Sequence, residues 1–122
     1  MFTGIIQATA PVVSTDPHTG NIRVRIQKPA KWKLSLGQSV AVDGVCSTVT
    51  KHAKTFFEVE YMPETLKKTT AGFLRKNALV NLERSLTLRD FVDGHLVAGH
   101  VDARSKVTRV ESGKKGHLIS IT

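Results

Sequence analysis

Polar and reactive side chains flank an Asp-Gly pair in the first half of the chain. Ser39 precedes Asp43-Gly44, and Cys46, Ser47 and Thr48 follow it. Asp-Gly favours a tight type I′ hairpin, so these residues are expected on two adjacent strands. Cys46 and Thr48 are two positions apart and share one strand face, where a thiol and a hydroxyl can hydrogen-bond to a ligand. The alternative for Cys46 is a small buried thiol, because free cysteine is among the most buried residue types.

A second group of polar residues begins a predicted helix over residues 63–71. Pro63 suits the first helical turn, Glu64 places a negative charge there, and Gly72 can end the helix. Free N–H groups at a helix start can donate to a carbonyl-rich or anionic ligand, and Glu64 can accept from ligand N–H or hydroxyl groups. Plain capping of the helix is the alternative explanation for Glu64 and Thr65.

Two histidines and a glycine complete the candidate residues. His95 and His100 are five apart, which places them on opposite faces of a strand, and no cysteine or carboxylate spacing supports a metal site. His100 can serve as an acid, a base or a ligand contact, or as a hydrogen-bonded structural histidine. Gly4 either lets a flat ligand approach the backbone or marks a bend in a strand.

Period-two alternation predicts the elements that position these residues. Ile22, Val24 and Ile26 alternate with polar residues, which indicates a half-buried strand. Turn residues at 16–20 join this strand to one over residues 2–13. Further strands are predicted on both sides of Asp43-Gly44 and over residues 55–60 and 79–84. Short strands with a single short helix predict an all-β fold, a small antiparallel barrel.

The composition is that of a globular domain. The chain has 122 residues, of which 40% are hydrophobic and 23% charged. No apolar run is long enough for a membrane span, and no signal peptide is visible. The single cysteine, Cys46, cannot form an internal disulfide, which favours a cytoplasmic protein.

The net charge of +8 raises the question of a nucleic-acid partner. The basic residues gather in three clusters: Lys28, Lys31 and Lys33; Lys67, Lys68, Arg75 and Lys76; and Lys114 and Lys115. A solvated basic surface explains them, and attraction of an anion such as nucleic acid is the alternative. Base stacking requires exposed aromatic residues beside the charge, and only Trp32 offers one clearly.

A faint internal repeat appears when the chain is shifted by 95 positions. Identical residues then coincide, and the apolar phase stays in step across two strands and a turn; the pairs are Gly4 with Gly99, Ala8 with Ala103, Val12 with Val107 and Ile26 with Ile121. We therefore expect residues 1–97 to form one barrel and residues 98–122 to open a second, incomplete one. Because such strands need partners, the chain is expected to be part of a longer two-barrel protein or to pair with another chain.

Four blocks, at residues 1–6, 39–50, 62–66 and 94–102, jointly resemble the amino-terminal barrel of riboflavin synthase, in the lumazine-binding barrel family. The resemblance implies a six-stranded antiparallel Greek-key barrel with one short helix, followed by the opening strands of a similar barrel. It implies a cofactor-free dismutation in which one 6,7-dimethyl-8-ribityllumazine donates a four-carbon unit to another. The products are riboflavin and 5-amino-6-(ribitylamino)pyrimidinedione.

The resemblance also assigns residues and partners. The substrate pocket is expected to be lined by Phe2, Gly4, Ile5, Ile6, Cys46, Ser47, Thr48, Glu60, Tyr61, Met62, Pro63, Glu64, Thr65, Gly99, His100 and Val101. Ser39, Cys46 and His100 match positions that assist proton transfer or nucleophile addition. The expected assembly is a homo-oligomer, a trimer for a full subunit and a dimer for a lone barrel, with no metal, nucleic acid or membrane.

One residue departs from the family pattern, and two other functions stay open. Ser47 stands where the family usually has leucine, which changes a contact at the pocket edge. Because most of the second barrel is missing, this chain is expected to bind substrate but to turn over poorly alone. The alternatives are a non-catalytic flavin or lumazine carrier and a basic barrel that binds nucleic acid.

Overall fold

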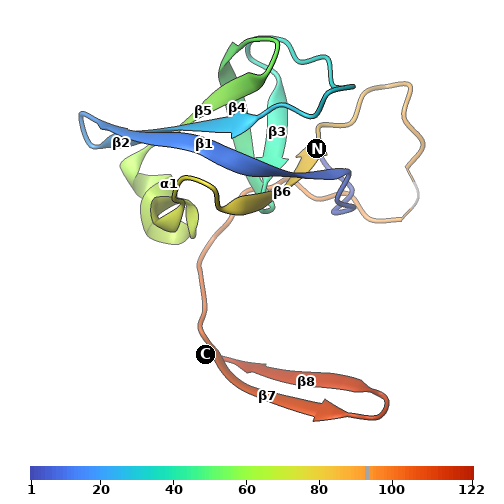
Figure 1. Cartoon of the computed structure of the whole chain (residues 1–122). Coiled ribbons are helices and arrows are strands. Elements are labelled where there is room, and N and C mark those ends of the chain that lie inside the picture. The colour runs from blue at the N-terminus through green and yellow to red at the C-terminus, as the bar shows by residue number, and fades with distance from the viewer. Residues whose placement is uncertain (93) are drawn as a thin grey trace.

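Six antiparallel strands close into a barrel in the computed structural model, which describes residues 1–92 and 94–122 (Figure 1). Around the barrel the strands follow the order β1-β2-β5-β4-β3-β6, and β6 pairs again with β1. The strands are β1 (Ala8–His18), β2 (Asn21–Gln27), β3 (Ser39–Val42), β4 (Val45–His52), β5 (Phe56–Tyr61) and β6 (Leu79–Arg84). This order confirms the predicted six-stranded Greek-key barrel.

Alternation along the strands builds the core of the barrel. Val24 and Ile26 of β2 are fully buried, and the arginines between and before them point outward. The side chains buried to the same degree from the other strands include Val12, Val40, Val49, Phe57, Val59, Val80 and Leu82. Each such aliphatic or aromatic side chain stabilises the fold by about 1.5–3 kcal/mol relative to an exposed one.

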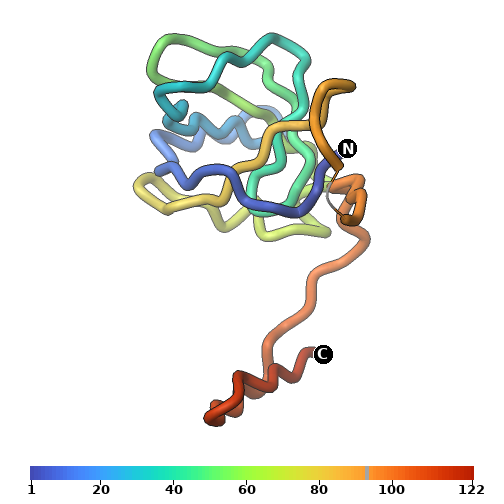
Figure 2. Tube along the Cα trace, turned by 90° about the vertical axis from the view of Figure 1, so that its right-hand side faces the viewer, coloured from blue at the N-terminus to red at the C-terminus, as the bar shows by residue number. Residues whose placement is uncertain are grey.

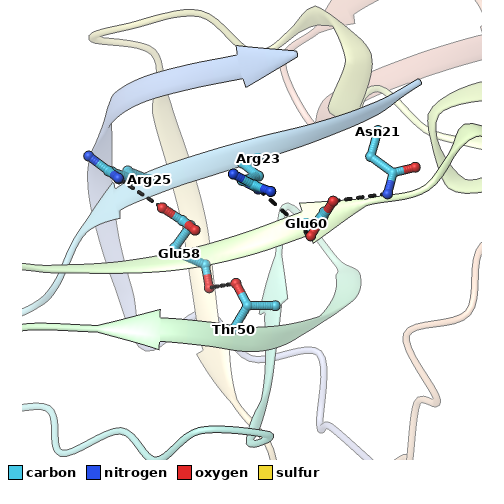
Figure 3. A network of polar contacts seen from close by, with 6 residues as sticks. All are labelled: Asn21, Arg23, Arg25, Thr50, Glu58 and Glu60. Carbon is cyan, nitrogen blue, oxygen red and sulfur yellow. Dashed lines mark hydrogen bonds and ion pairs between the residues drawn. The ribbon is translucent and has the colours of Figure 1, made fainter. Parts of the chain in front are cut away.

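Oppositely charged residues face each other across β2 and β5 on the outside of the barrel (Figure 3). Arg25 Nε donates to Glu58 Oε2 at 2.8 Å, and Arg23 Nε lies 4.0 Å from Glu60 Oε2. Asn21 Nδ2 also donates to Glu60 Oε1 at 2.9 Å. These cross-strand pairs favour the register in which the apolar residues of both strands face the core.

The predicted type I′ hairpin is confirmed at Asp43-Gly44. Asp43 has φ +48° and Gly44 has φ +80°, and Val42 pairs with Val45 beside them. The Asp43 carboxylate accepts from the Asn81 amide at 2.7 Å, and the Asp43 amide donates to the Asn81 carbonyl at 2.8 Å. The turn is thereby fixed to β6.

Two elements begin or end elsewhere than the sequence predicts. The first strand begins at Ala8 rather than at residue 2, because Gly4 has φ +80°, which interrupts an extended chain. The helix α1 (Pro63–Lys68) ends before the predicted residue 71. Its C-cap is Thr69, whose backbone is extended and whose hydroxyl donates to the Thr65 carbonyl at 2.7 Å. A 3₁₀ turn (Ala71–Phe73) follows, so Gly72 does not end the helix.

The last two strands, β7 (Val107–Gly113) and β8 (Gly116–Ile121), form a separate hairpin. Figures 1 and 2 show this hairpin, in red, away from the barrel at the end of an extended linker. Its apolar side chains are exposed; they are Val107, Val110, Leu118, Ile119 and Ile121. Among the described residues, no helix is long and apolar enough to cross a membrane.

One polar pair lies inside the barrel. Ser47 and Tyr61 are both buried, and their hydroxyl oxygens are 2.9 Å apart. Burial raises the pKa of the Tyr61 hydroxyl to about 12, although the hydrogen bond with Ser47 opposes this rise. The folded state therefore holds Tyr61 neutral at pH values where an unfolded tyrosine has ionised.

This shift predicts a loss of stability in alkali. Between pH 10 and pH 12 the unfolded chain loses the Tyr61 proton while the folded chain keeps it, so the free energy of unfolding should fall by roughly 2 kcal/mol. Urea unfolding of wild type and Tyr61→Phe across this range measures the effect, since the variant lacks this part of the fall. Tyr61 is the only tyrosine. A tyrosinate absorbance midpoint near pH 10 in the folded chain would contradict the prediction.

Candidate ligand-binding cleft

A cleft of about 420 Å³ opens on the outside of the barrel where three segments meet. The segments are the start of β4, the helix α1 with the residue after it, and the chain just before the β7–β8 linker. Its lining consists of Val45, Cys46, Thr48, Glu64, Thr65, Lys68, Thr69, Gly99, His100 and Val101. Residues far apart in the sequence therefore form one surface.

Strand alternation decides which residues of β4 reach the cleft. Cys46 and Thr48 line it, which confirms that they share one strand face. Ser47 points to the opposite side, where its hydroxyl donates to the Val45 carbonyl at 3.0 Å and contacts Tyr61. The exposed Thr48 hydroxyl and the half-buried Cys46 thiol thus face the cleft, and the Ser47 hydroxyl belongs to the interior.

The wall formed by Gly99, His100 and Val101 is held against β4 by a backbone hydrogen bond. The Cys46 amide donates to the Gly99 carbonyl at 2.8 Å. A Cβ on Gly99 would lie 2.9 Å from Cys46 Cβ and 3.0 Å from Phe2 Cε2, so only glycine fits without displacement. Gly99 also has φ +80°, which L-residues with side chains rarely adopt. The small size of Gly99 therefore brings His100 and Val101 next to β4.

The helix contributes a carboxylate, a hydroxyl and an ammonium group. Lys68 Nζ donates to Glu64 Oε1 at 2.8 Å, one helical turn away. This hydrogen bond lowers the pKa of Glu64 and raises the pKa of Lys68, so both groups are charged at neutral pH. Because the two charges offset each other, the helix wall carries little net charge.

This set of groups suits a flat, polar ring with a hydroxylated side chain. Val45 and Val101 provide apolar surface, while Cys46, Thr48, Thr65 and His100 provide donors and acceptors. Imidazole can donate and accept a proton near neutral pH, and hydroxyl groups can bond to both members of an ion pair. The cleft can therefore orient an uncharged heterocycle and assist proton transfer at its edge.

Comparison with known proteins identifies the family of the chain. The lumazine binding domain family model matches residues 3–85. The chain belongs to the lumazine-binding domain family.

The chain is similar to curated riboflavin synthases. The riboflavin synthase of Bacillus subtilis (strain 168) is 41% identical over 113 residues, which cover 91% of the chain and 52% of the relative. That of Escherichia coli (strain K12) is 35% identical over 121 residues, covering 98% of the chain and 57% of the relative. The chain therefore spans about half the length of these relatives.

Solved structures show the same fold. LumP complexed with 6,7-dimethyl-8-(1'-D-ribityl)lumazine matches with a TM-score of 0.82 and 18% identity, over 99% of this chain and 68% of that one. LumP complexed with riboflavin matches with a TM-score of 0.80 and 19% identity, over 93% and 62%. At this identity the likeness concerns the fold of the lumazine-binding barrel.

The structure gathers seven of the sequence-predicted site residues in the cleft: Cys46, Thr48, Glu64, Thr65, Gly99, His100 and Val101. Phe2 is buried beneath Gly99, and Ser39 on β3 pairs with Thr48 in the strand register. Phe2 therefore lies behind one wall of the cleft, and Ser39 lies beside Thr48 with its side chain on the same face of the sheet. Their position lets them support the walls of the cleft.

The other predicted residues lie elsewhere on the lumazine-binding barrel. Ser47 and Tyr61 are interior, and Glu60 is on the outer face with Asn21. The remaining five are at the surface or in the N-terminal segment; they are Gly4, Ile5, Ile6, Met62 and Pro63.

Sequence reasoning missed three residues that line the cleft. Val45 comes directly before Cys46, the first residue predicted to line the pocket on this strand. Thr69 lies where the sequence predicts that the helix continues. Lys68 belongs to a basic cluster in the sequence, although its spacing of four from Glu64 could have indicated their ion pair. A local charge pair next to the Pro-Glu-Thr segment is the signal that would have identified Lys68.

Trp32, the aromatic residue expected to stack on nucleic-acid bases, is buried. Trp32 is 8% exposed, and the Arg84 guanidinium lies 5.2 Å from the centre of its ring. A buried indole covered by arginine cannot receive a nucleotide base. The feature that favoured nucleic acid is thus part of the barrel core.

The fit of Gly99 predicts a local clash on substitution. Gly99→Ala should destabilise the contact between Cys46 and residue 99 by about 1–3 kcal/mol more than Gly37→Ala destabilises its own loop. Gly37 has φ +79°, but a Cβ added there would meet no other atom within 4 Å, so its substitution carries backbone strain alone. Hydrogen exchange of the Cys46 amide, together with urea unfolding, measures the difference. Equal effects of the two substitutions would contradict it.

Proposed function

We propose that this chain is the amino-terminal barrel of a riboflavin synthase and that its cleft binds 6,7-dimethyl-8-ribityllumazine and riboflavin. The observation that carries the proposal is the cleft itself, in which thiol, hydroxyl and imidazole groups lie beside an ion pair. Riboflavin synthases that share 41% and 35% identity with most of the chain support the same function.

In the proposed complex, the pterin ring lies against Cys46 and Thr48, with His100 at one edge and Thr65 at another. The ribityl hydroxyl groups reach Glu64 and Lys68, which offer an acceptor and a donor. A polyol can replace the solvent of an exposed ion pair without adding charge. This assignment leaves the ring edge near the thiol and the imidazole.

The proposed reaction is a dismutation between two such substrates, one of which gives a four-carbon unit to the other. Deprotonation of an activated ring methyl and addition of a nucleophile require positioned polar groups. We assign His100 and Cys46 to these steps and Ser39, which lies beside Thr48 on the neighbouring strand β3, to their support. The products would be riboflavin and 5-amino-6-(ribitylamino)pyrimidinedione, with no cofactor.

Residues 98–122 are proposed to begin a second barrel after a first barrel at residues 1–97. The β7–β8 hairpin repeats the register of β1–β2: Val12 pairs with Ile26, and Val107 pairs with Ile121, 95 positions later. The register shift at Val12/Ser14 recurs at Val107/Arg109, and both hairpins close at equivalent positions. Identical pairing and an identical irregularity support an origin by duplication.

The repeat also suggests a role for the N-terminal residues outside the cleft. Phe2 and Val97, which are separated by the repeat offset of 95 positions, form a bridge with two backbone hydrogen bonds of 2.8 Å. Gly4 and Gly99 are equivalent as well, and both have φ +80°. As Gly99 leads into one wall of this cleft, we propose that Gly4, Ile5 and Ile6 line the corresponding cleft of a second barrel.

A complete enzyme on this proposal brings two clefts together, from one chain or from neighbouring chains. We propose a homo-oligomer, a trimer for a full-length subunit and a dimer for a lone first barrel. The exposed apolar side chains of Ile5 and of the β7–β8 hairpin support burial against further protein. The single free thiol, Cys46, favours the cytoplasm as its location.

His100 provides the sharpest test of the cleft. His100→Ala should weaken riboflavin binding by roughly tenfold, because one hydrogen bond and ring contact are lost. His95→Ala is the matched control, since His95 is exposed and lies outside the cleft lining. Fluorescence titration with riboflavin measures both variants. Equal affinities for His100→Ala and wild type would contradict the assignment.

Turnover distinguishes an enzyme from a carrier. The chain mixed with 6,7-dimethyl-8-ribityllumazine should bind it and form riboflavin slowly or not at all, because the second cleft is incomplete. Addition of the carboxy-terminal half of a full-length relative should raise the rate of riboflavin formation. Binding without any gain in rate would instead indicate a flavin or lumazine carrier.

A further inference from the structure

A buried carboxylate on β6 holds the N-terminal segment of the chain. Glu83 is 3% exposed, and its Oε1 accepts from the Thr3 amide at 2.6 Å and the Thr3 hydroxyl at 2.7 Å. Its Oε2 accepts from the Gly4 amide at 3.0 Å. A buried carboxylate is costly unless it is hydrogen-bonded, and these three donors compensate for the lost water. The pairing joins residues about eighty positions apart.

The held segment in turn supports one wall of the cleft. Phe2, next to Thr3, is 1% exposed. Its amide donates to the Val97 carbonyl and its carbonyl accepts from the Val97 amide, both at 2.8 Å. Its ring lies where a Cβ on Gly99 would approach within 3.0 Å, so Phe2 packs directly against Gly99. The Gly99 carbonyl accepts from the Cys46 amide at 2.8 Å. Contacts therefore run without a break from Glu83 to the cleft.

We propose that Glu83 is a positioning residue for the cleft. It fixes Thr3 and Gly4, these fix Phe2 and its bridge to Val97, and the bridge places Gly99 and His100 beside Cys46. The part of this inference that concerns ligand affinity rests on the proposed function. The part that concerns how residues 97–101 cover Cys46 depends on the structure alone.

Glu83→Gln tests the inference with little change in shape. Glutamine keeps one oxygen but turns an NH₂ group toward a donor, so the N-terminal segment should detach more often. Cys46 is the only cysteine in the chain, and its reaction with Ellman's reagent reports directly on this cover. The rate of the folded variant should rise by roughly tenfold, and the riboflavin dissociation constant should rise in parallel.

Glu58→Gln is the matched control. Glu58 is also buried at 8% exposure, and its bond of 2.8 Å to Arg25 joins two barrel strands on the outer face (Figure 3). This substitution should lower the free energy of unfolding without changing the thiol rate or riboflavin affinity. A general loss of stability would raise the thiol rate in both variants and would overturn the positioning role.

A second variant keeps the test decisive if Glu83→Gln fails to fold. Thr3→Val removes the hydroxyl donor to Glu83 Oε1 and leaves both amide donors, so the thiol rate should rise in the same direction by a smaller factor. An unchanged thiol rate in folded Glu83→Gln, or in Thr3→Val where that variant alone folds, would overturn the inference. If wild type fails to bind riboflavin, the proposed function falls, and the thiol rates still decide the role of Glu83.

Discussion

Strand β6 hydrogen-bonds to β1 on one side and to β3 on the other, and this double pairing closes the barrel. The same strand holds three features that shape the cleft. Asn81 fixes the Asp43-Gly44 turn that leads into β4, Leu82 fills the core, and Glu83 secures the N-terminal segment. The closing strand therefore couples barrel stability to the placement of residues that lie far from it in sequence.

The cleft depends on the absence of a side chain as much as on the side chains present. Gly99 allows two backbone segments to approach and hydrogen-bond, and it leaves Phe2 packed below. Glu64 and Lys68, the charged residues of α1 that line the cleft, form an ion pair, so the cleft suits an uncharged heterocycle with a polyol. In the proposed enzyme, binding energy comes from apolar contact and hydrogen bonds, which also orient two identical substrates for reaction.

Local patterns made the barrel predictable. Alternation in β2 and the Asp43-Gly44 pair specify strands and a turn within a few residues, and these agree with the structure. The family resemblance placed Cys46, Ser47 and Thr48 together in the pocket. Strand alternation separates them, because Ser47 faces the interior while Cys46 and Thr48 face the cleft. Glu83 gave no local signal, because its partners are two backbone amides and a hydroxyl some eighty residues away. The interruption at Gly4 had a local signal, since a glycine can adopt the positive φ that ends an extended strand.

A crystal structure of the chain with 6,7-dimethyl-8-ribityllumazine tests the central claim most directly. The account predicts the ring against Cys46 and Thr48, with His100 at its edge and the ribityl group at Glu64 and Lys68. It also predicts that Ile5 and Ile6 do not contact that ligand within the same barrel. A ligand bound at another face of the barrel, with this cleft empty, would contradict the account.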